Sequence, residues 1–176
     1  MGLFDRLMGR ELPERRDARK IYFHLLEQSR RPEFFQADGF EDNYDGRIDV
    51  ITLHMAVLME RMQSEGADGK LLNQALFDEM KDDFEIALRE EGIADTGVKR
   101  RIKPMIGHFY DRLKAYTDAL QSEDPNAALQ AAFTIEGDEG DAFKARAATY
   151  MTSFLKYLEG EPFKAISKAQ FMFPVL

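Results

Sequence analysis

Residues 46–64 read GRIDVITLHMAVLMERMQS, and this stretch decides the fold. Its apolar residues recur at three- and four-residue intervals, which is the spacing of one helix face. One stripe consists of Ile48, Ile51, Met55, Leu58 and Met62, and another of Val50, Leu53 and Val57. A helix that is apolar nearly all round is normally buried. The sequence therefore predicts a buried central helix over residues 46–64.

The segments on both sides of this helix have the same three- and four-residue spacing, and none alternates over the length of a strand. Further helices are expected over residues 13–30, 68–92, 104–120 and 125–135, then up to residue 160, and in a short element after residue 161. The predicted fold class is all-α, a single helical-bundle domain of about six to seven helices. A long irregular loop over residues 32–45 should precede the central helix, and loops of this length are often functional.

Local signals set the expected boundaries of these helices. Asp68 is a candidate N-cap, and Asp124 followed by Pro125 is a cap with proline at the first helical position. Because an interior proline removes a backbone hydrogen bond, the helix around Pro104 should begin there, after a separate turn over residues 98–102. Residues 136–140 are expected to form a loop. The apolar tail over residues 171–174 should pack back on the bundle.

Composition excludes several kinds of chemistry. The 176 residues contain no cysteine, so a disulfide framework, a zinc ribbon and a thiol nucleophile are excluded. The net charge of −8 argues against nucleic acid as the main partner. Residues 32–96 carry five basic and 17 acidic side chains. This acidic segment has two interpretations, a solvated face that keeps the protein soluble and a field that steers a basic partner.

No complete metal or catalytic motif is found. Residues 41–52 resemble a calcium loop, but Thr52 stands where the bidentate glutamate must be. The Glu-x-x-His pairs of di-iron bundles are absent. His24, His54 and His108 fall on three different predicted helices, where each is either a hydrogen-bonded core group or a base or ligand. We therefore expect no metal and no cofactor.

Residues 1–12 are predicted to form an N-terminal amphipathic segment, with residues 13–176 as the helical domain. One face of this segment is expected to carry Leu3, Phe4, Leu7 and Met8, and the other side Arg6 and Arg10. Such a segment either lies weakly on an anionic membrane or packs on the bundle. Since no secretory signal or membrane span is found, the expected location is cytoplasmic, with peripheral association at the inner face of the cytoplasmic membrane left open.

Several ordered blocks of the chain resemble the ubiquinol–cytochrome c chaperone family, whose members are assembly factors for the cytochrome bc1 complex. The blocks are RRPEFF (30–35), DGRIDVITLH (45–54), LFDEMKDD (76–83), LREEGIAD (88–95), KRRIK (99–103) and FYDRLKAY (109–116). The resemblance spans about residues 19–160. Because the transit and membrane-proximal sequence of mitochondrial members is missing, the chain is similar to a short bacterial-type member.

This resemblance implies a non-catalytic, all-helical chaperone that binds newly made cytochrome b and supports assembly of the bc1 complex. In mitochondria the family works with a small partner subunit and at the ribosome, and the resemblance leaves open whether this chain needs either. The polar members of the blocks are the expected partner-binding residues. They are Arg47, His54, Asp78, Arg89, Glu90, Tyr110, Arg112 and Tyr116.

Two further interpretations stay open at this point. The polar residues of the blocks could pair among themselves across helices, because a buried arginine needs a partner, or they could form a client-facing surface.

The chain could also be a helical carrier for a small apolar ligand such as quinone, lipid or haem. A carrier needs a deep apolar cavity, whereas a chaperone needs an open surface groove.

Overall fold

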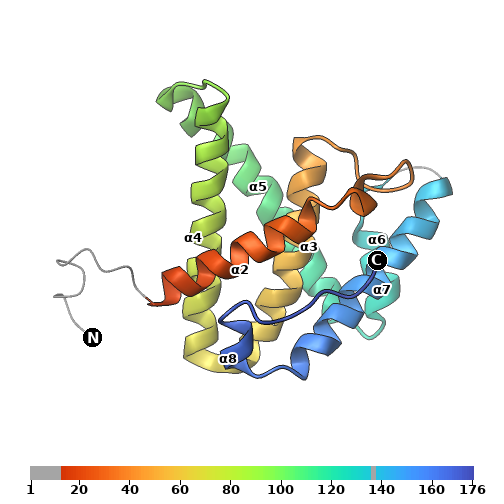
Figure 1. Cartoon of the computed structure of the whole chain (residues 1–176). Helices are drawn as coiled ribbons and strands as arrows, with labels where there is room; N and C mark the ends of the chain where they lie inside the picture. The colour runs from red at the N-terminus through yellow and green to blue at the C-terminus, as the bar shows by residue number, and fades with distance from the viewer. Residues whose placement is uncertain (1–12, 136–137) are drawn as a thin grey trace.

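The computed structural model describes residues 13–135 and 138–176, and all regular elements in these ranges are helical (Figure 1). The helices are α2 (Pro13–Ser29), the 3₁₀ helix η1 (Pro32–Phe35), α3 (Tyr44–Met62), the 3₁₀ helix η2 (Gln63–Glu65), α4 (Gly66–Glu90), α5 (Asp95–Leu120), α6 (Pro125–Ala132), α7 (Asp138–Glu159) and α8 (Phe163–Ile166). The all-α prediction is confirmed. The amphipathic segment predicted over residues 1–12 lies outside the described residues.

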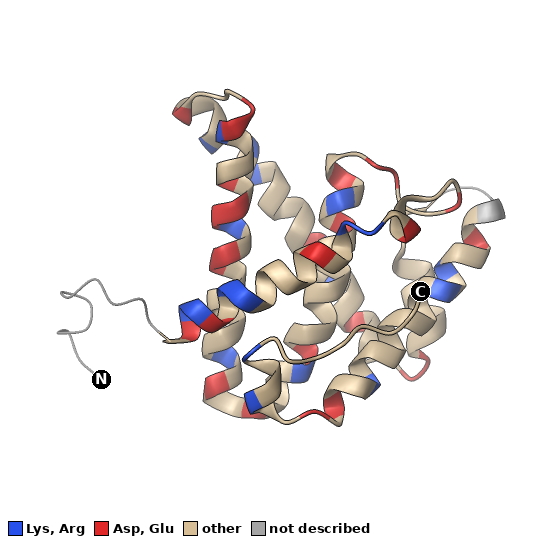
Figure 2. Ribbon diagram, viewed as in Figure 1, with Lys and Arg blue, Asp and Glu red and all other residues tan. Residues whose placement is uncertain are grey.

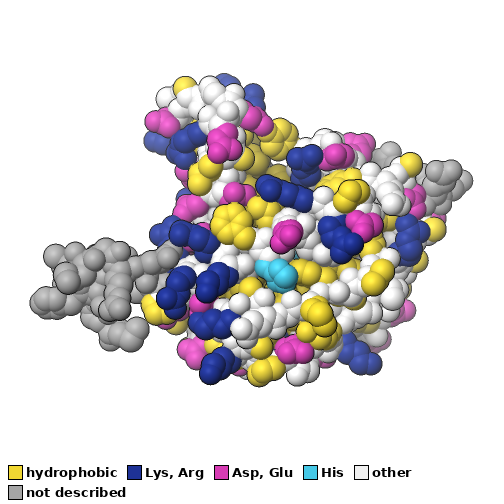
Figure 3. Space-filling model, viewed as in Figure 1, with side chains coloured by type: hydrophobic (Ala, Val, Ile, Leu, Met, Phe, Trp, Pro, Cys, Tyr) yellow, Lys and Arg dark blue, Asp and Glu magenta, His cyan; other side chains and the backbone are white. Residues whose placement is uncertain are grey.

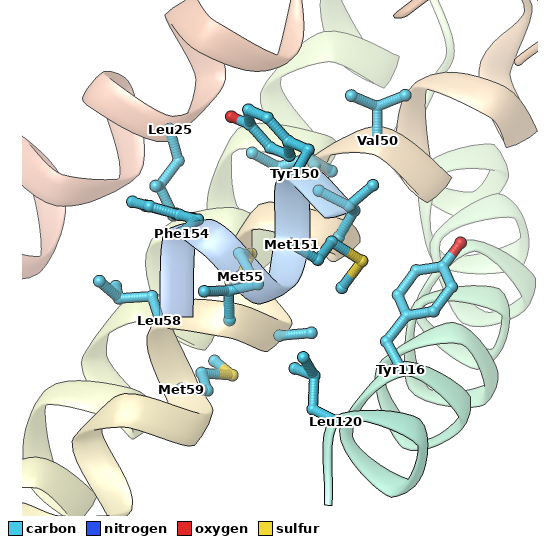
Figure 4. Packing of buried hydrophobic residues seen from close by; sticks show 14 of the residues in the cluster. Leu25, Val50, Met55, Leu58, Met59, Tyr116, Leu120, Tyr150, Met151 and Phe154 are labelled. Atoms are coloured by element: carbon cyan, nitrogen blue, oxygen red, sulfur yellow. The ribbon is translucent and has the colours of Figure 1, made fainter. Parts of the chain in front are cut away.

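Helix α3 is the central element, as its sequence predicts. All residues from Ile48 to Met59 are buried, and α3 contacts α2, α4, α5 and α7. Figure 4 shows Val50, Met55 and Leu58 of α3 packed among side chains of the surrounding helices. Tyr150 and Phe154 of α7 are among these neighbours. The apolar stripes of one helix therefore organise the whole core.

Helices α4 and α5 extend as a pair beyond the rest of the bundle (Figure 1). Helix α2 crosses α4 and α3, and the C-terminal segment after α8 runs back alongside α2. We refer to the projecting end of α4 and α5, residues 84–105, as the arm. Its base lies next to the start of α3, because Tyr44 of α3 and Met105 of α5 line a common pocket.

The predicted start of the central helix and the extent of the preceding loop need correction. Asn43 is the N-cap, and its side-chain oxygen accepts a hydrogen bond from the backbone N–H of Gly46 at 2.9 Å. The helix thus begins at Tyr44, two residues earlier than expected. Pro32–Phe35 form a 3₁₀ turn, so the irregular stretch is shorter than the predicted loop. Phe34 and Phe40 are buried and anchor this stretch.

The helix starts predicted at Asp68 and Pro104 are wrong. Helix α4 already begins at Gly66, whose φ of 60° ends the preceding 3₁₀ turn, so Asp68 lies within the first helical turn. Helix α5 runs unbroken from Asp95 through Pro104. The carbonyl left without its usual donor belongs to Arg100, and both Arg100 and Pro104 are exposed, so water can solvate it.

The loop predicted over residues 136–140 is also shorter than expected, because α7 begins at Asp138. Gly140 is buried, and a Cβ there would come within 2.8 Å of the Ile135 side chain. This glycine therefore serves close packing inside a helix and not a turn. The cap at Asp124 is confirmed, since its carboxylate accepts from the Ala127 N–H at 3.1 Å.

The C-terminal tail packs back on the bundle through Phe171, which is buried, and Phe173, whose ring lies 4.8 Å from that of His24. Met172 differs from the expectation, because it is 73% exposed. In the part of the chain that the structure describes, no helix combines the length and the apolar character needed to cross a bilayer.

Candidate functional site

An apolar groove with a volume of about 470 Å³ lies where α2, the 36–43 stretch, α3, α4 and α5 meet. Its floor is one stripe of α3, formed by Tyr44, Ile48 and Ile51, because residues four and three apart share a helix face. The remaining apolar lining consists of Leu26, Pro32, Phe35, Phe84, Ala87 and Met105. Four residues of the lining, Pro32, Phe35, Asp42 and Tyr44, belong to the loop predicted over residues 32–45.

The groove is open to solvent and is not an enclosed chamber. Tyr44 is 49% exposed, and Arg30, Asp42 and Arg47 on the border are also exposed. Figure 3 shows apolar side chains in the hollow between the arm and the rest of the molecule. A second pocket of about 250 Å³ shares Tyr44 and Met105 with the groove and extends it toward the arm. The volume of the groove lies within the range of pockets that hold small apolar ligands, and its open side leaves room for an apolar polypeptide segment as well.

Hydrogen-bonded charges hold α2 against α4 and so fix one wall of the groove. Arg15 and Arg19 both donate to the nearly buried Glu79, at 3.1 and 3.0 Å. The Tyr22 hydroxyl donates to Asp83 at 2.8 Å. Burial and the neighbouring Asp83 carboxylate raise the pKa of Tyr22 well above its usual value, so this donor stays protonated.

Arg47 lies on the border of the groove, where its Nε donates to Asp42 at 2.7 Å. The hydrogen bond to Asp42 raises the pKa of Arg47 further. Both side chains are more than half exposed, so the pair is accessible to a bound partner. Of the eight predicted site residues, Arg47 is the one that lines this groove.

Arg112 and Tyr116 point into the interior beside Asp49, an acidic residue of α3 that is only 4% exposed. Asp49 accepts hydrogen bonds from His108 Nε2 at 2.7 Å and from Thr134 at 3.3 Å. Burial raises the pKa of Asp49, and the charges of His108 and Arg112 oppose this effect. Arg112 Nη1 donates to the Ala132 carbonyl at 3.3 Å, which ties α5 to α6.

A polar cavity of about 520 Å³ lies over this cluster. It is lined by Ala37, Gly39, Phe40, Glu41, Asn43, Asp45, Gly46, Asp49, His108, Thr134 and Ile135. Among the side chains that the structure describes, no group of three or more histidine and acidic residues is placed to hold a metal ion. The hydrogen bonds of Asp49 join α3 to α5 and to the segment after α6.

His54 belongs to a separate buried network. Its Nδ1 lies 2.8 Å from the Val50 carbonyl oxygen and its Nε2 lies 2.8 Å from the Tyr150 hydroxyl oxygen. Gln28 donates to the same hydroxyl at 3.2 Å. Complete burial lowers the pKa of His54 to about 4, so the imidazole is neutral near pH 7. Of the two sequence-based interpretations, the hydrogen-bonded core group is the one that fits His54.

The four remaining predicted site residues lie outside the groove. Asp78 accepts from Gln74 on the surface of α4, and Glu90 is exposed at the end of the same helix. Arg89 is half exposed and contacts Glu85 at 3.3 Å and Asp95 at 3.5 Å. Tyr110 is 50% exposed, with its ring 5.2 Å from that of Phe77. The eight residues thus do not form one continuous surface, and their partner-binding role stays a prediction.

Sequence reasoning missed two kinds of residue. Asp49 carried a usable signal, because it is the one carboxylate between Ile48 and Met59, and a buried carboxylate must find partners. Met105 and Phe84 carried no such signal, since each looks like an ordinary core residue of its own helix. The groove that they line exists only once α4 and α5 are packed against α3.

The described residues thus form an all-α bundle with an open apolar groove that is bordered by charged side chains. A comparison with known protein families identifies the family of this chain. The family model described as ubiquinol-cytochrome C chaperone matches residues 36–173. The chain therefore belongs to the ubiquinol-cytochrome C chaperone family, as the sequence blocks indicated.

Relatives in other organisms agree with this assignment. Ubiquinol-cytochrome c reductase complex assembly factor 1 of Homo sapiens is 24% identical over 144 residues, which cover 81% of this chain and 48% of that protein. The Xenopus laevis protein of the same name is 26% identical over 107 residues, 61% of this chain and 54% of that protein. The chain spans about half the length of these curated relatives.

A solved structure shares the complete fold. The crystal structure of the Cbp3 homolog from Brucella abortus superimposes with a TM-score of 0.76 at 27% sequence identity. The match covers 98% of this chain and 95% of the other. The two proteins thus share the arrangement of helices described above.

Proposed function

We propose that this protein is a non-catalytic assembly factor for ubiquinol–cytochrome c reductase, the bc1 complex, and that it binds newly made cytochrome b through the apolar groove. Its family, and the names of its relatives, support the assembly role. The observation that carries the binding mode is the open groove of about 470 Å³ at the base of the arm. The proposed location is cytoplasmic, peripheral to the inner face of the membrane that holds the client.

The chemistry of the groove suits a membrane-protein client. Before assembly, such a client exposes apolar side chains that need cover, and the groove offers the partly exposed side chains of Phe35, Tyr44 and Met105. Its cytoplasmic loops are rich in lysine and arginine. The groove itself is lined by two acids, Asp42 and Asp83, and two arginines, so the attraction would come from the acidic segment over residues 32–96 as a whole. Apolar contact then supplies affinity, and charge supplies the rate of encounter.

Capture of cytochrome b by tagged protein tests this proposal. We expect wild-type protein to recover cytochrome b from its own membranes, with slower capture at 1 M salt, because the screening length falls to about 3 Å there. Tyr44→Glu places a charge at the exposed end of the groove floor and should reduce recovery by about tenfold or more. Leu71→Glu is the matched control, since Leu71 is similarly exposed (56%) but lies on α4 outside the groove.

The same capture experiment distinguishes the groove from other candidate client sites and from the carrier hypothesis. Tyr110→Glu changes an equally exposed tyrosine of α5 that does not line the groove, and it tests the predicted role of that residue. A loss with Tyr110→Glu and none with Tyr44→Glu would move the client site away from the groove. If no variant and no wild-type preparation recovers cytochrome b, but organic extraction releases quinone, lipid or haem, the carrier hypothesis replaces this proposal.

A further inference from the structure

One exposed stripe of α2 combines positive charge with an exposed aromatic ring. Its members are exposed and follow one another at three- and four-residue spacing, so they share one side of the helix: Arg16, Lys20, Phe23 and Glu27. Arg30, which is also exposed, follows in the turn directly after the helix. Phe23 is 53% exposed. Among the described residues, none of the three basic side chains has an ion-pair partner, and Glu27 is the one acid of the stripe.

The C-terminal segment extends this surface. The Asp17–Lys168 ion pair attaches the turn after α8 to α2, and the His24 ring nitrogen Nε2 donates to the Phe171 carbonyl at 2.9 Å. These contacts hold Met172 beside α2 with 73% of its surface exposed, and Val175 is 94% exposed.

Lys164 of α8 adds a further exposed cation that lacks an ion-pair partner within the described ranges. We name the surface formed by Arg16, Lys20, Phe23, Lys164, Met172 and Val175 the α2–α8 face. Figure 2 shows lysine and arginine along the first part of α2 and on α8. Figure 3 shows apolar side chains exposed among these cations on the same side of the molecule. The face is locally basic although the chain carries a net charge of −8.

A second basic run, on α5, lacks the apolar component. Lys99, Arg100, Arg101 and Lys103 are exposed, but the run contains no exposed large apolar side chain, because Ile102 is partly buried. Surfaces that lie on bilayers combine cations with exposed apolar groups, which enter the headgroup region. The two basic regions therefore differ in the feature that membrane binding requires.

We propose that the α2–α8 face docks on the surface of an anionic lipid bilayer, with its cations at the lipid headgroups and Phe23, Met172 and Val175 in the interfacial layer. This proposal names the surface responsible for the peripheral location given under the proposed function. It depends on that function only for the position of the client. Arg30, at the end of the α2 stripe, also lines the groove. Docking in this orientation would bring the groove close to the membrane that holds an unassembled client.

Sedimentation of the full chain with vesicles tests the face without any client. Vesicles of phosphatidylcholine with about one third phosphatidylglycerol should bind wild-type protein, and pure phosphatidylcholine should not. The triple variant Arg16→Glu/Lys20→Glu/Lys164→Glu should weaken binding by on the order of 100-fold, because each cation near an anionic surface contributes about fivefold. Phe23→Ala/Met172→Ala should remove the binding that persists at 0.5 M salt.

A matched control changes the net charge by the same amount at the other basic run. Lys99→Glu/Arg100→Glu/Lys103→Glu should leave vesicle binding within about twofold of wild type, since the charge near the lipid is unchanged. Equal losses in the two triple variants would overturn the assignment to the α2–α8 face, and so would failure of folded wild-type protein to bind anionic vesicles. Circular dichroism confirms that each variant is folded. Neither result depends on whether cytochrome b is the client.

Discussion

Two ionisable side chains of α3 lie in the apolar core, and each is accommodated in a different way. His54 is neutral, since it is fully buried with both ring nitrogens within hydrogen-bonding distance of a partner. Asp49 is paired with His108 and Thr134. A buried polar group without partners is costly, so the neighbours of these residues are as constrained as the residues themselves. This explains why polar positions of a family motif can be structural and lie away from a binding surface.

The depressed pKa of His54 predicts a pH dependence of stability. The unfolded chain takes up the proton near pH 6.5 and the folded chain only near pH 4, so between these values the unfolded state binds more protons. Stability should therefore fall as the pH is lowered from about 6.5 to 4, with a contribution of about 3 kcal/mol from this residue. Urea unfolding at several pH values checks this. His54→Gln should have a visibly smaller slope than wild type, and equal slopes would refute the prediction.

Arg89 and Arg61 differ in burial, so replacing them should change the free energy of unfolding by different amounts. Arg89 is half exposed, so Arg89→Ala should lower the free energy of unfolding by less than about 1 kcal/mol. The Arg61 side chain is only 9% exposed and donates to the Leu158 carbonyl at 2.9 Å and to Glu65 at 2.6 Å. Arg61→Ala should cost about 2–4 kcal/mol. Thermal or urea unfolding compares the two variants, and similar losses would contradict the structural distinction.

At the scale of elements, the start of α3 depends on close backbone approach at Gly46. A Cβ at this position would lie 2.0 Å from the Glu41 carbonyl oxygen, so the backbone would have to move. Gly46→Ala should therefore destabilise the protein by about 1–3 kcal/mol. Gly107 in α5 is the matched control, since a Cβ there meets nothing within 4 Å. Gly107→Ala should stabilise by up to about 1 kcal/mol through helix propensity, and a loss equal to that of Gly46→Ala would be inconsistent with this account.

Element boundaries were predictable where the determining contacts are local. Pro13, Pro32 and the Asp124–Pro125 cap act within one helical turn, and the helices begin or end where these residues indicate. The errors at Pro104 and Gly140 have a tertiary origin. Solvent access at Arg100 lets a helix continue through proline, and packing against Ile135 places a glycine inside a helix. Neither cause can be read from the neighbouring sequence.

At the scale of the whole molecule, the helical class and the buried central helix followed from the apolar pattern alone. The groove did not, because its lining comes from α2, α3, α4, α5 and the segment before α3. Of the predicted site residues, Arg47 borders the groove, while His54, Arg112 and Tyr116 support the interior. The family motifs therefore identified the family of the chain, but most of their polar residues lie away from the groove.

The central claim is that the groove supports assembly of the bc1 complex, and the amount of assembled complex in membranes tests it most directly. The strain that naturally encodes the protein would carry a deletion complemented with wild type, Tyr44→Glu or Leu71→Glu, each at equal protein level. We predict that the deletion and Tyr44→Glu strains lack most of the assembled complex and its haem-loaded cytochrome b, whereas wild type and Leu71→Glu restore both. Normal complex levels in the deletion strain, or in the Tyr44→Glu strain, would contradict the claim.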